Sequence, residues 1–299
     1  MTKETNTFSL IVMDRARRRW RFIAFLAIIF LFFTVPNFSQ KANLTGYIAR
    51  VDITGFITSD KEQLATLEQL ETNAQVKAIT VYIDSPGGTM VGGFDIYNSL
   101  RRINEVKPVV CVMGTTAASA GYMVALGCPY IIASPASLTG SIGVFMPLVD
   151  ATGLADKIGI QSASVASGSL KMATSPLEKQ TPEAKRYLQN MVTDLQKTFM
   201  HYVTKHRQMN DEHIKIISDG RALTGRRALE LGLIDALGDV TTAKKWLVKH
   251  HSISHDTPVR DVTLIQEKSF FDKALSSLSF VESFSASVQS TGIMASMKP

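Results

Sequence analysis

The sequence predicts an α/β fold built on a mainly parallel sheet, followed by a more helical region. Short apolar runs that suit buried strands, such as 76–83 and 108–113, alternate with longer amphipathic segments such as 89–103. This alternation is typical of βαβ units with right-handed crossovers. About 260 residues follow the N-terminal segment, which is enough for one large domain.

The elements can be placed in chain order from their apolar spacing and their turn residues. We expect strands at 46–53, 76–83, 108–113 and 129–133. We expect helices around 64–70, over 89–103, from residue 119 and over 182–206, with short helices in 224–237. The predicted domain covers 39–250, and 251–299 forms a C-terminal extension whose Ser-rich part, 276–290, is expected to be loosely ordered.

A membrane anchor is predicted near the N-terminus. Five arginines between 15 and 21 immediately precede an apolar run that extends, with its interfacial ends, over 22–38. The length approaches that of a membrane span, and the arginines of the leader 1–21 should stay in the cytoplasm. A cleaved signal peptide is the competing interpretation, but the polar leader is long and no Ala-x-Ala pattern follows the run. The domain should therefore lie outside the inner membrane.

Composition limits the other partners and ligands. Much of the net charge of +6 comes from the leader, so it indicates contact with anionic lipid rather than with nucleic acid. Cys111 and Cys128 lie in apolar surroundings and are interpreted as buried small hydrophobes rather than as a disulfide. The six histidines have no ligand spacing, so we expect neither a metal nor another cofactor.

A lone serine among small residues is the most informative feature. Ser119 follows the apolar run 108–113, at the point where a strand would turn into a helix. A hydroxyl held there can attack a carbonyl while the N–H of Ala120 stabilises the oxyanion. Gly87 and Gly88, at the end of the preceding strand, can bring a second N–H close. Taken alone, each segment is more typical of an ordinary N-cap or turn.

A serine nucleophile needs a base. All histidines occur at 201 or later, so a Ser-His-Asp triad is the weaker hypothesis, although distant partners are possible. Lys171 lies among small and apolar residues, with no other charge between 157 and 178. Desolvation would lower the pKa of its amine and make it a general base, although an exposed lysine is the commoner case. Ser141 could orient that amine.

Together these segments resemble the signal peptide peptidase A family of membrane-anchored serine peptidases. The matching segments are 84–88, 117–122, 138–144, Lys171 with 175–176, 219–221, 224–226 and 229–238, and the resemblance extends over 47–247. It implies a fold related to Clp protease and the crotonases, with Ser119 as nucleophile, Lys171 as base and Ser141 assisting the lysine. Two residues depart from the family pattern: Ala120 replaces a frequent glycine, and Met172 replaces a common acidic residue.

The resemblance implies an endopeptidase that degrades hydrophobic peptides, such as cleaved signal peptides. A single set of motifs is similar to the short form, which assembles as a homo-oligomeric ring, and Lys171 could serve its own or a neighbouring chain. Three alternatives stay open: a paralogous periplasmic peptidase with other substrates, a crotonase-type acyl-CoA enzyme, and a non-catalytic membrane scaffold.

Overall fold

The computed structural model describes residues 46–264. The predicted leader, the anchor 22–38 and the Ser-rich stretch 276–290 lie outside the described residues. Within 46–264, no helix is both long and apolar enough to span a membrane.

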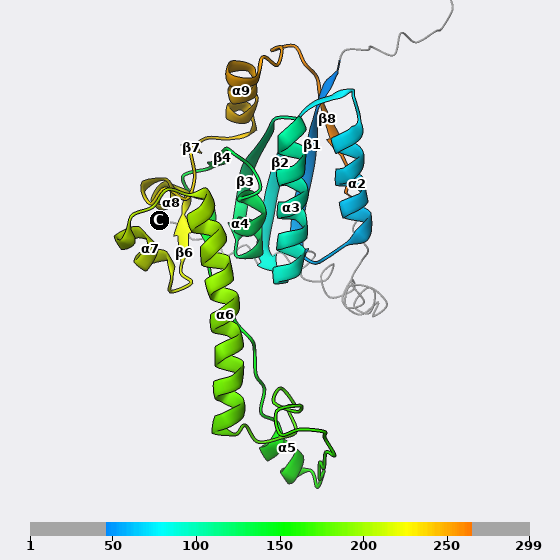
Figure 1. Cartoon of the computed structure of the whole chain (residues 1–299), viewed down its shortest axis with the longest axis vertical. Coiled ribbons are helices and arrows are strands. Elements are labelled where there is room, and N and C mark those ends of the chain that lie inside the picture. The colour runs from blue at the N-terminus through cyan, green and yellow to red at the C-terminus, as the bar shows by residue number, and fades with distance from the viewer. Residues whose placement is uncertain (1–45, 265–299) are drawn as a thin grey trace, which may run out of the picture. The chain divides into compact units, whose positions relative to one another are not determined.

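One sheet organises the described part of the chain (Figure 1). Its strand order is β6-β5-β3-β2-β1-β8, and β4 pairs with β3 and with β7. All pairs are parallel except β5–β6. The strands are β1 (Tyr47–Ile57), β2 (Val76–Gly88), β3 (Val109–Ala118), β4 (Ile131–Ala133), β5 (Leu138–Gly140), β6 (Ala222–Thr224), β7 (Ala236–Leu237) and β8 (Val259–Val262).

Helices cover both faces of the sheet. They are α2 (Lys61–Thr72), α3 (Met90–Val106), α4 (Ala120–Ala125), α5 (Thr152–Lys157), α6 (Pro182–His206), α7 (Asp211–Ile217), α8 (Gly225–Glu230) and α9 (Val240–His251). Successive side chains of a strand point to opposite faces. Val51 and Ile53 of β1 therefore pack in one cluster with α2, α3 and α4, whereas Ile48 packs with Ala243 and Leu247 of α9.

The predicted α/β fold is confirmed, and the four expected strands are present. Three of them are longer than expected: β1 continues to Ile57, β2 to Gly88 and β3 to Ala118. The strands β1 and β2 continue because their pairing resumes after an irregularity, with Phe56 opposite Gly87 and Ile57 opposite Gly88. The segment expected to be a turn is thus the last part of a strand. The further expectation of a Clp/crotonase-like repeat stays a prediction.

The two ends of the long helix α6 pack in different hydrophobic clusters. Phe199 and Val203, near its C-terminal end, are buried in the main core. Ala184 and Leu188, near its N-terminal end, pack in a small separate cluster with residues of the preceding segment. We call that segment, residues 144–181, the arm; it includes α5 and lies at the N-terminal end of α6 (Figure 1).

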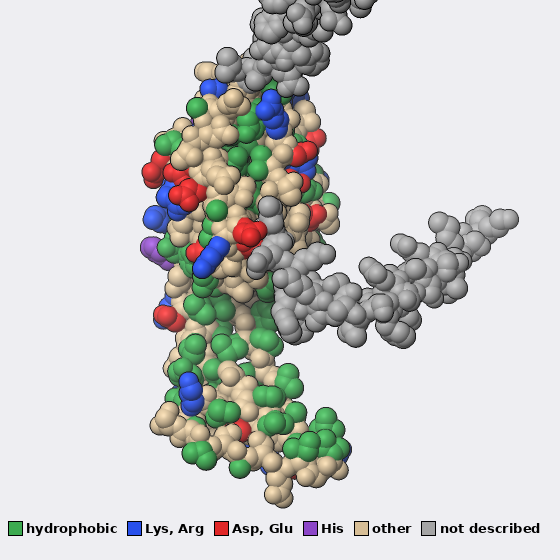
Figure 2. Space-filling model, turned by 90° about the vertical axis from the view of Figure 1, so that its right-hand side faces the viewer, with side chains coloured by type: hydrophobic (Ala, Val, Ile, Leu, Met, Phe, Trp, Pro, Cys, Tyr) green, Lys and Arg blue, Asp and Glu red, His purple; other side chains and the backbone are tan. Residues whose placement is uncertain are grey.

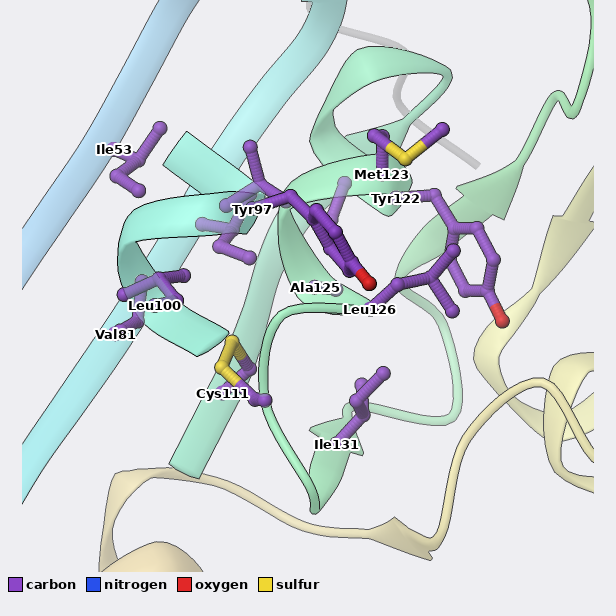
Figure 3. Close-up of a cluster of buried hydrophobic side chains, with 14 of the residues drawn as sticks. Ile53, Val81, Tyr97, Leu100, Cys111, Tyr122, Met123, Ala125, Leu126 and Ile131 are labelled. Atoms are coloured by element: carbon purple, nitrogen blue, oxygen red, sulfur yellow. A yellow bond between two sulfur atoms is a disulfide. The ribbon is translucent and has the colours of Figure 1, made fainter. Parts of the chain in front are cut away.

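The interpretation of the two cysteines as unpaired was wrong. Cys111 and Cys128 are buried as expected, but they form a disulfide (Figure 3). The apolar surroundings predicted burial, whereas pairing depends on how β3 and the chain after α4 come together, with their Cα atoms 5.8 Å apart. The closed loop contains Ser119 near its middle.

Candidate active site

A cavity of about 770 Å³ lies where several elements meet at the sheet. Its walls come from the ends of β1 and β2, the start of α4, the segment after β5, the middle of α6 and the loop before β6. The sequence-predicted residues that line it are Gly87, Gly88, Ser119 and Ser141. Ala120 follows Ser119 as the first residue of α4. Lys171 is not among the lining residues.

Ser119 occupies a strained turn between β3 and α4. Its φ is +53°, in a region that residues with a side chain rarely adopt. Its N–H donates to the Gly140 carbonyl at 2.9 Å, and its carbonyl accepts from Met123 at 3.0 Å. The hydroxyl does not cap α4, so the interpretation as a simple N-cap does not hold. Such strain costs about 1–3 kcal/mol and clusters at functional sites.

Glycines let the end of β2 approach Ser119. Gly87 has a φ of +130°, and a Cβ built on it would lie 2.9 Å from the Ser119 Cβ. Its N–H already donates to the Ser85 hydroxyl at 3.1 Å. The N–H of Thr89 donates to Ile57 of β1, so that of Gly88 faces the opposite edge of β2, where β3 lies. Gly88 is therefore the better placed of the two donors.

Ser141 lies immediately after β5, opposite the loop before β6. Its φ is +49°, and its N–H donates to the Arg221 carbonyl at 2.9 Å. The segment after Ser141 also lies against the loop before β6, because a Cβ on Gly143 would lie 3.2 Å from the Gly220 Cα. The motifs 138–144 and 219–221, far apart in the sequence, thus form one wall of the cavity.

The charged group on that wall is Asp219. It accepts hydrogen bonds from the backbone and guanidinium of Arg221, the latter at 2.9 Å, and these bonds hold the pKa of its carboxyl below the usual range. Among residues 46–264, no group of three or more His, Cys, Asp and Glu side chains could hold a metal ion.

Lys171 lies in the arm and does not line the cavity. Its side chain is exposed, and its neighbours Leu170 and Ala173 pack against Ala184 and Leu188 of α6. The arm contributes Phe145 and Pro147 to the cavity wall instead. Within one chain, Ser119 therefore lines this pocket and Lys171 does not.

Sequence reasoning missed a polar stripe on α6. Gln189, Thr193 and Gln196 line the cavity from this helix. The sequence predicted the helix over 182–206 but no functional side chain on it. The spacing of four and three residues between these polar side chains is a helical repeat, and it was the signal that could have found them.

Comparison with known proteins identifies the family. The model of peptidase family S49 matches residues 101–254. A protein of Synechocystis sp. that is named a protease is 38% identical over 69% of this chain and 75% of its own length. One from Methanocaldococcus jannaschii, also named a protease, is 33% identical over 63% of this chain and 61% of its own.

A third relative comes from Enterococcus faecium and is named a signal peptide peptidase, SppA. It is 31% identical over 69% of this chain and 58% of its own length. The matched part of the chain thus spans between about three fifths and three quarters of these three relatives. The match includes the strand, turn and helix that carry Ser119, and it extends through the segments of Ser141, Lys171 and Arg221. The chain belongs to peptidase family S49, among the SppA-like peptidases.

Proposed function

We propose that this chain is a membrane-anchored serine endopeptidase in which Ser119 is the nucleophile and Lys171 the general base. The observation that carries the proposal is the strained turn at Ser119, which lies beside Gly87 and Ser141 on one cavity. Membership of a peptidase family supports a catalytic role for the serine in this turn.

In the proposed reaction, the amine of Lys171 takes the proton of the Ser119 hydroxyl as Oγ bonds to the scissile carbonyl carbon. The N–H groups of Ala120 and Gly88 donate to the resulting oxyanion. When the carbon–nitrogen bond breaks, the ammonium returns the proton to the leaving amine. Water then cleaves the acyl ester on Ser119, with Lys171 again as base. Ser141 orients the amine.

Lys171 reaches the cavity from a neighbouring copy in this proposal. Within one chain it is exposed and outside the cavity, while the arm around it presents many apolar side chains to solvent. They are Phe145, Leu148, Val149, Leu154, Ile158, Ile160, Val165 and Leu177. Figure 2 shows hydrophobic side chains gathered on this end of the molecule. Exposed apolar side chains gathered in one region are typical of an interface, and a homo-oligomeric ring would cover them.

The proposed substrates are hydrophobic peptides, such as cleaved signal peptides. Phe56, Val144, Phe145, Pro147 and Val192 give the cavity apolar walls. A peptide would lie extended beside the Gly87–Gly88 end of β2 and bind partly through its backbone. The Enterococcus faecium relative is named for signal peptides, which favours this class over other peptides.

The proposed location keeps the leader in the cytoplasm, the segment 22–38 in the inner membrane and the peptidase domain 39–250 outside it. The Cys111–Cys128 disulfide supports this location, because disulfides persist in oxidising compartments and are rare in the cytoplasm. The predicted extension 251–299 begins within the same sheet, since β8 (Val259–Val262) pairs with β1.

Mixing two inactive variants tests the roles of Ser119 and Lys171. It also tests whether Lys171 acts in its own chain or in a neighbouring one. Ser119→Ala and Lys171→Ala should each lose cleavage of a fluorogenic apolar peptide, while Lys157→Ala, another arm lysine, should retain it. If Lys171 acts across subunits, co-assembly of the two inactive variants in equal amounts should restore about a quarter of the sites. A mixture that stays inactive would place the base in its own chain. Activity retained by either single variant would remove that residue from the mechanism.

The same assay separates the remaining alternatives. Turnover of an acyl-CoA thioester without peptide cleavage would favour a crotonase-type enzyme. Peptide binding without cleavage by the wild-type protein would favour a scaffold. Family membership favours peptide cleavage.

A further inference from the structure

We propose that Gln196 is a positioning residue of this site and that it acts through Ser141. The inference rests on the proposed function, since it assigns a part in peptide cleavage to a side chain on α6. Gln196 lines the same cavity as Ser119 and Ser141.

The Gln196 amide joins two loops that form one wall of the cavity. Its Nε2 donates to the carbonyl of Ile142 at 2.9 Å and to the carbonyl of Ser218 at 3.2 Å. Ile142 directly follows Ser141, and Ser218 directly precedes Asp219 in the loop that leads to β6. One side chain from the middle of α6 thereby fixes both loops to the same helix.

The orientation of this amide is determined by its partners. Both are carbonyl oxygens, so the side-chain nitrogen must face them, because a rotated amide would place oxygen against oxygen. The Gln196 Oε1 is then buried with no hydrogen-bond partner among the described residues. Burying an unpaired acceptor costs free energy, and an apolar side chain would avoid that cost. The two donated bonds are the advantage that glutamine offers at this position.

These bonds act on the backbone around Ser141. On one side of its Cα, the Ser141 N–H is held by the Arg221 carbonyl. On the other side, the Ile142 carbonyl is held by Gln196, and the Ile142 side chain is fully buried. The two anchors bracket Ser141, whose φ is +49°, and Ile142, and they restrict rotation of the backbone between them. Gln196 thus helps to fix the direction of the Cα–Cβ bond of Ser141, whose hydroxyl is proposed to orient the Lys171 amine.

A glutamine outside the cavity offers a matched control. Gln63 of α2 is also buried, but it does not line the cavity, and its side-chain nitrogen has no hydrogen-bond partner among the described residues. Gln63→Met and Gln196→Met make the same chemical change at a buried helical position. Only the second removes the bridge between the two loops.

The experiment measures kcat and KM for peptide cleavage by the full chain in its detergent-extracted or lipid-reconstituted form. Gln196→Met should lower kcat about ten- to a hundredfold and leave KM nearly unchanged, because it misplaces a group that acts on the base. Gln63→Met should leave both constants near the wild-type values. Gln196→His returns an N–H donor at a similar reach and should recover part of kcat.

A double-mutant cycle tests whether Gln196 acts through Ser141. Ser141→Ala with Gln196→Met should be no slower than Ser141→Ala alone, since the bridge then has no hydroxyl to direct. Additive losses, a change in KM only, or an unchanged Gln196→Met variant would overturn the inference. If Gln196→Met does not fold, Gln196→His alone and in the cycle provides the same comparison. Failure of the proposed function is recognised separately, because Ser119→Ala would then retain cleavage.

Discussion

The turn that holds Ser119 and the arm that holds Lys171 belong to one chain but differ in what supports them. Around Ser119, the residues Ala117, Ala120 and Tyr122 are buried, and the Tyr122 hydroxyl donates to the Leu233 carbonyl at 2.8 Å. The disulfide closes the same stretch. The strained backbone of Ser119 is therefore held by a close-packed core.

The arm has little support of this kind within the chain. Its buried contact is the small cluster of Ala173 with Ala184 and Leu188, and much of its apolar surface faces solvent. Apolar surface is stabilised when it is removed from water, so the arm acquires that stabilisation from a neighbour in the proposed ring. The difference teaches that packing in the core positions Ser119, whereas in the proposed mechanism the position of Lys171 depends on assembly.

The largest expected effect tests how tightly the chain is packed at the end of β2, near Ser119, compared with the arm. A Cβ on Gly88 would lie 2.0 Å from the Ile57 carbonyl oxygen, whereas a Cβ on Gly168 in the arm would meet nothing within 4 Å. Gly88→Ala should lower the free energy of unfolding by about 3 kcal/mol or more, because backbone must shift. Gly168→Ala should leave it unchanged. Urea unfolding of both variants checks this; equal losses would remove the contrast between the regions.

The second effect tests the disulfide that closes the loop around Ser119. The paired change Cys111→Ala and Cys128→Ala opens a short loop and should lower the free energy of unfolding by about 2–3 kcal/mol. A reducing agent that reaches the disulfide should lower the free energy of unfolding of the wild type. It should leave that of the paired variant unchanged. Two free thiols in the wild-type protein unfolded without reductant would contradict the assigned disulfide.

A smaller effect concerns the anchoring of α6 to the core. His206 lies at its C-terminal end, and its Nε2 contacts the Tyr97 hydroxyl at 2.5 Å. Burial, with the positive charges of Arg101, Lys205 and Arg207, lowers the pKa of His206 from 6.5 to about 4. Between these values the unfolded chain binds the proton and the folded chain does not. Stability contributed by neutral His206 is thus complete above pH 6.5 and is lost as the pH falls towards 4.

The imidazole is partly exposed, so the loss should stay under about 2 kcal/mol after solvent screening is considered. Unfolding measured at pH 7.5 and at pH 5 should show a smaller difference for His206→Gln than for the wild type. His255→Gln, a change at an exposed histidine, serves as the control. An unchanged pH dependence in His206→Gln would show that this contact does not sense protonation.

The smallest effect on stability is expected in the arm, where assembly should change instead. Leu154→Ser with Ile158→Ser replaces two exposed side chains and should alter the free energy of unfolding of the dissociated chain by less than about 0.5 kcal/mol. The same variant should reduce the mass of the extracted particle and its peptidase activity. Val106→Ser, at an exposed position outside the arm, should change neither. Intact assembly of the arm variant would show that these side chains do not form the interface.

The sequence predicted the parts that depend on local pattern. Apolar runs of strand length placed β1 to β4, because burial between helices favours continuous apolar residues. The small residues around Ser119 predicted a sharp strand-to-helix turn, and the structure has that turn. Local pattern did not predict the short strands β5 to β8, since two to four residues carry too little periodicity.

By itself, the sequence determined that the chain is an α/β protein and predicted that Gly87, Gly88, Ser119 and Ser141 belong to one site. Only the tertiary structure decided that Cys111 meets Cys128, that Gln196 bridges two loops, and that Lys171 lies outside the cavity of its own chain. The physical reason is distance along the chain. Strand and turn propensities act over a few neighbouring residues, whereas these contacts join segments that meet only when helices pack on the sheet.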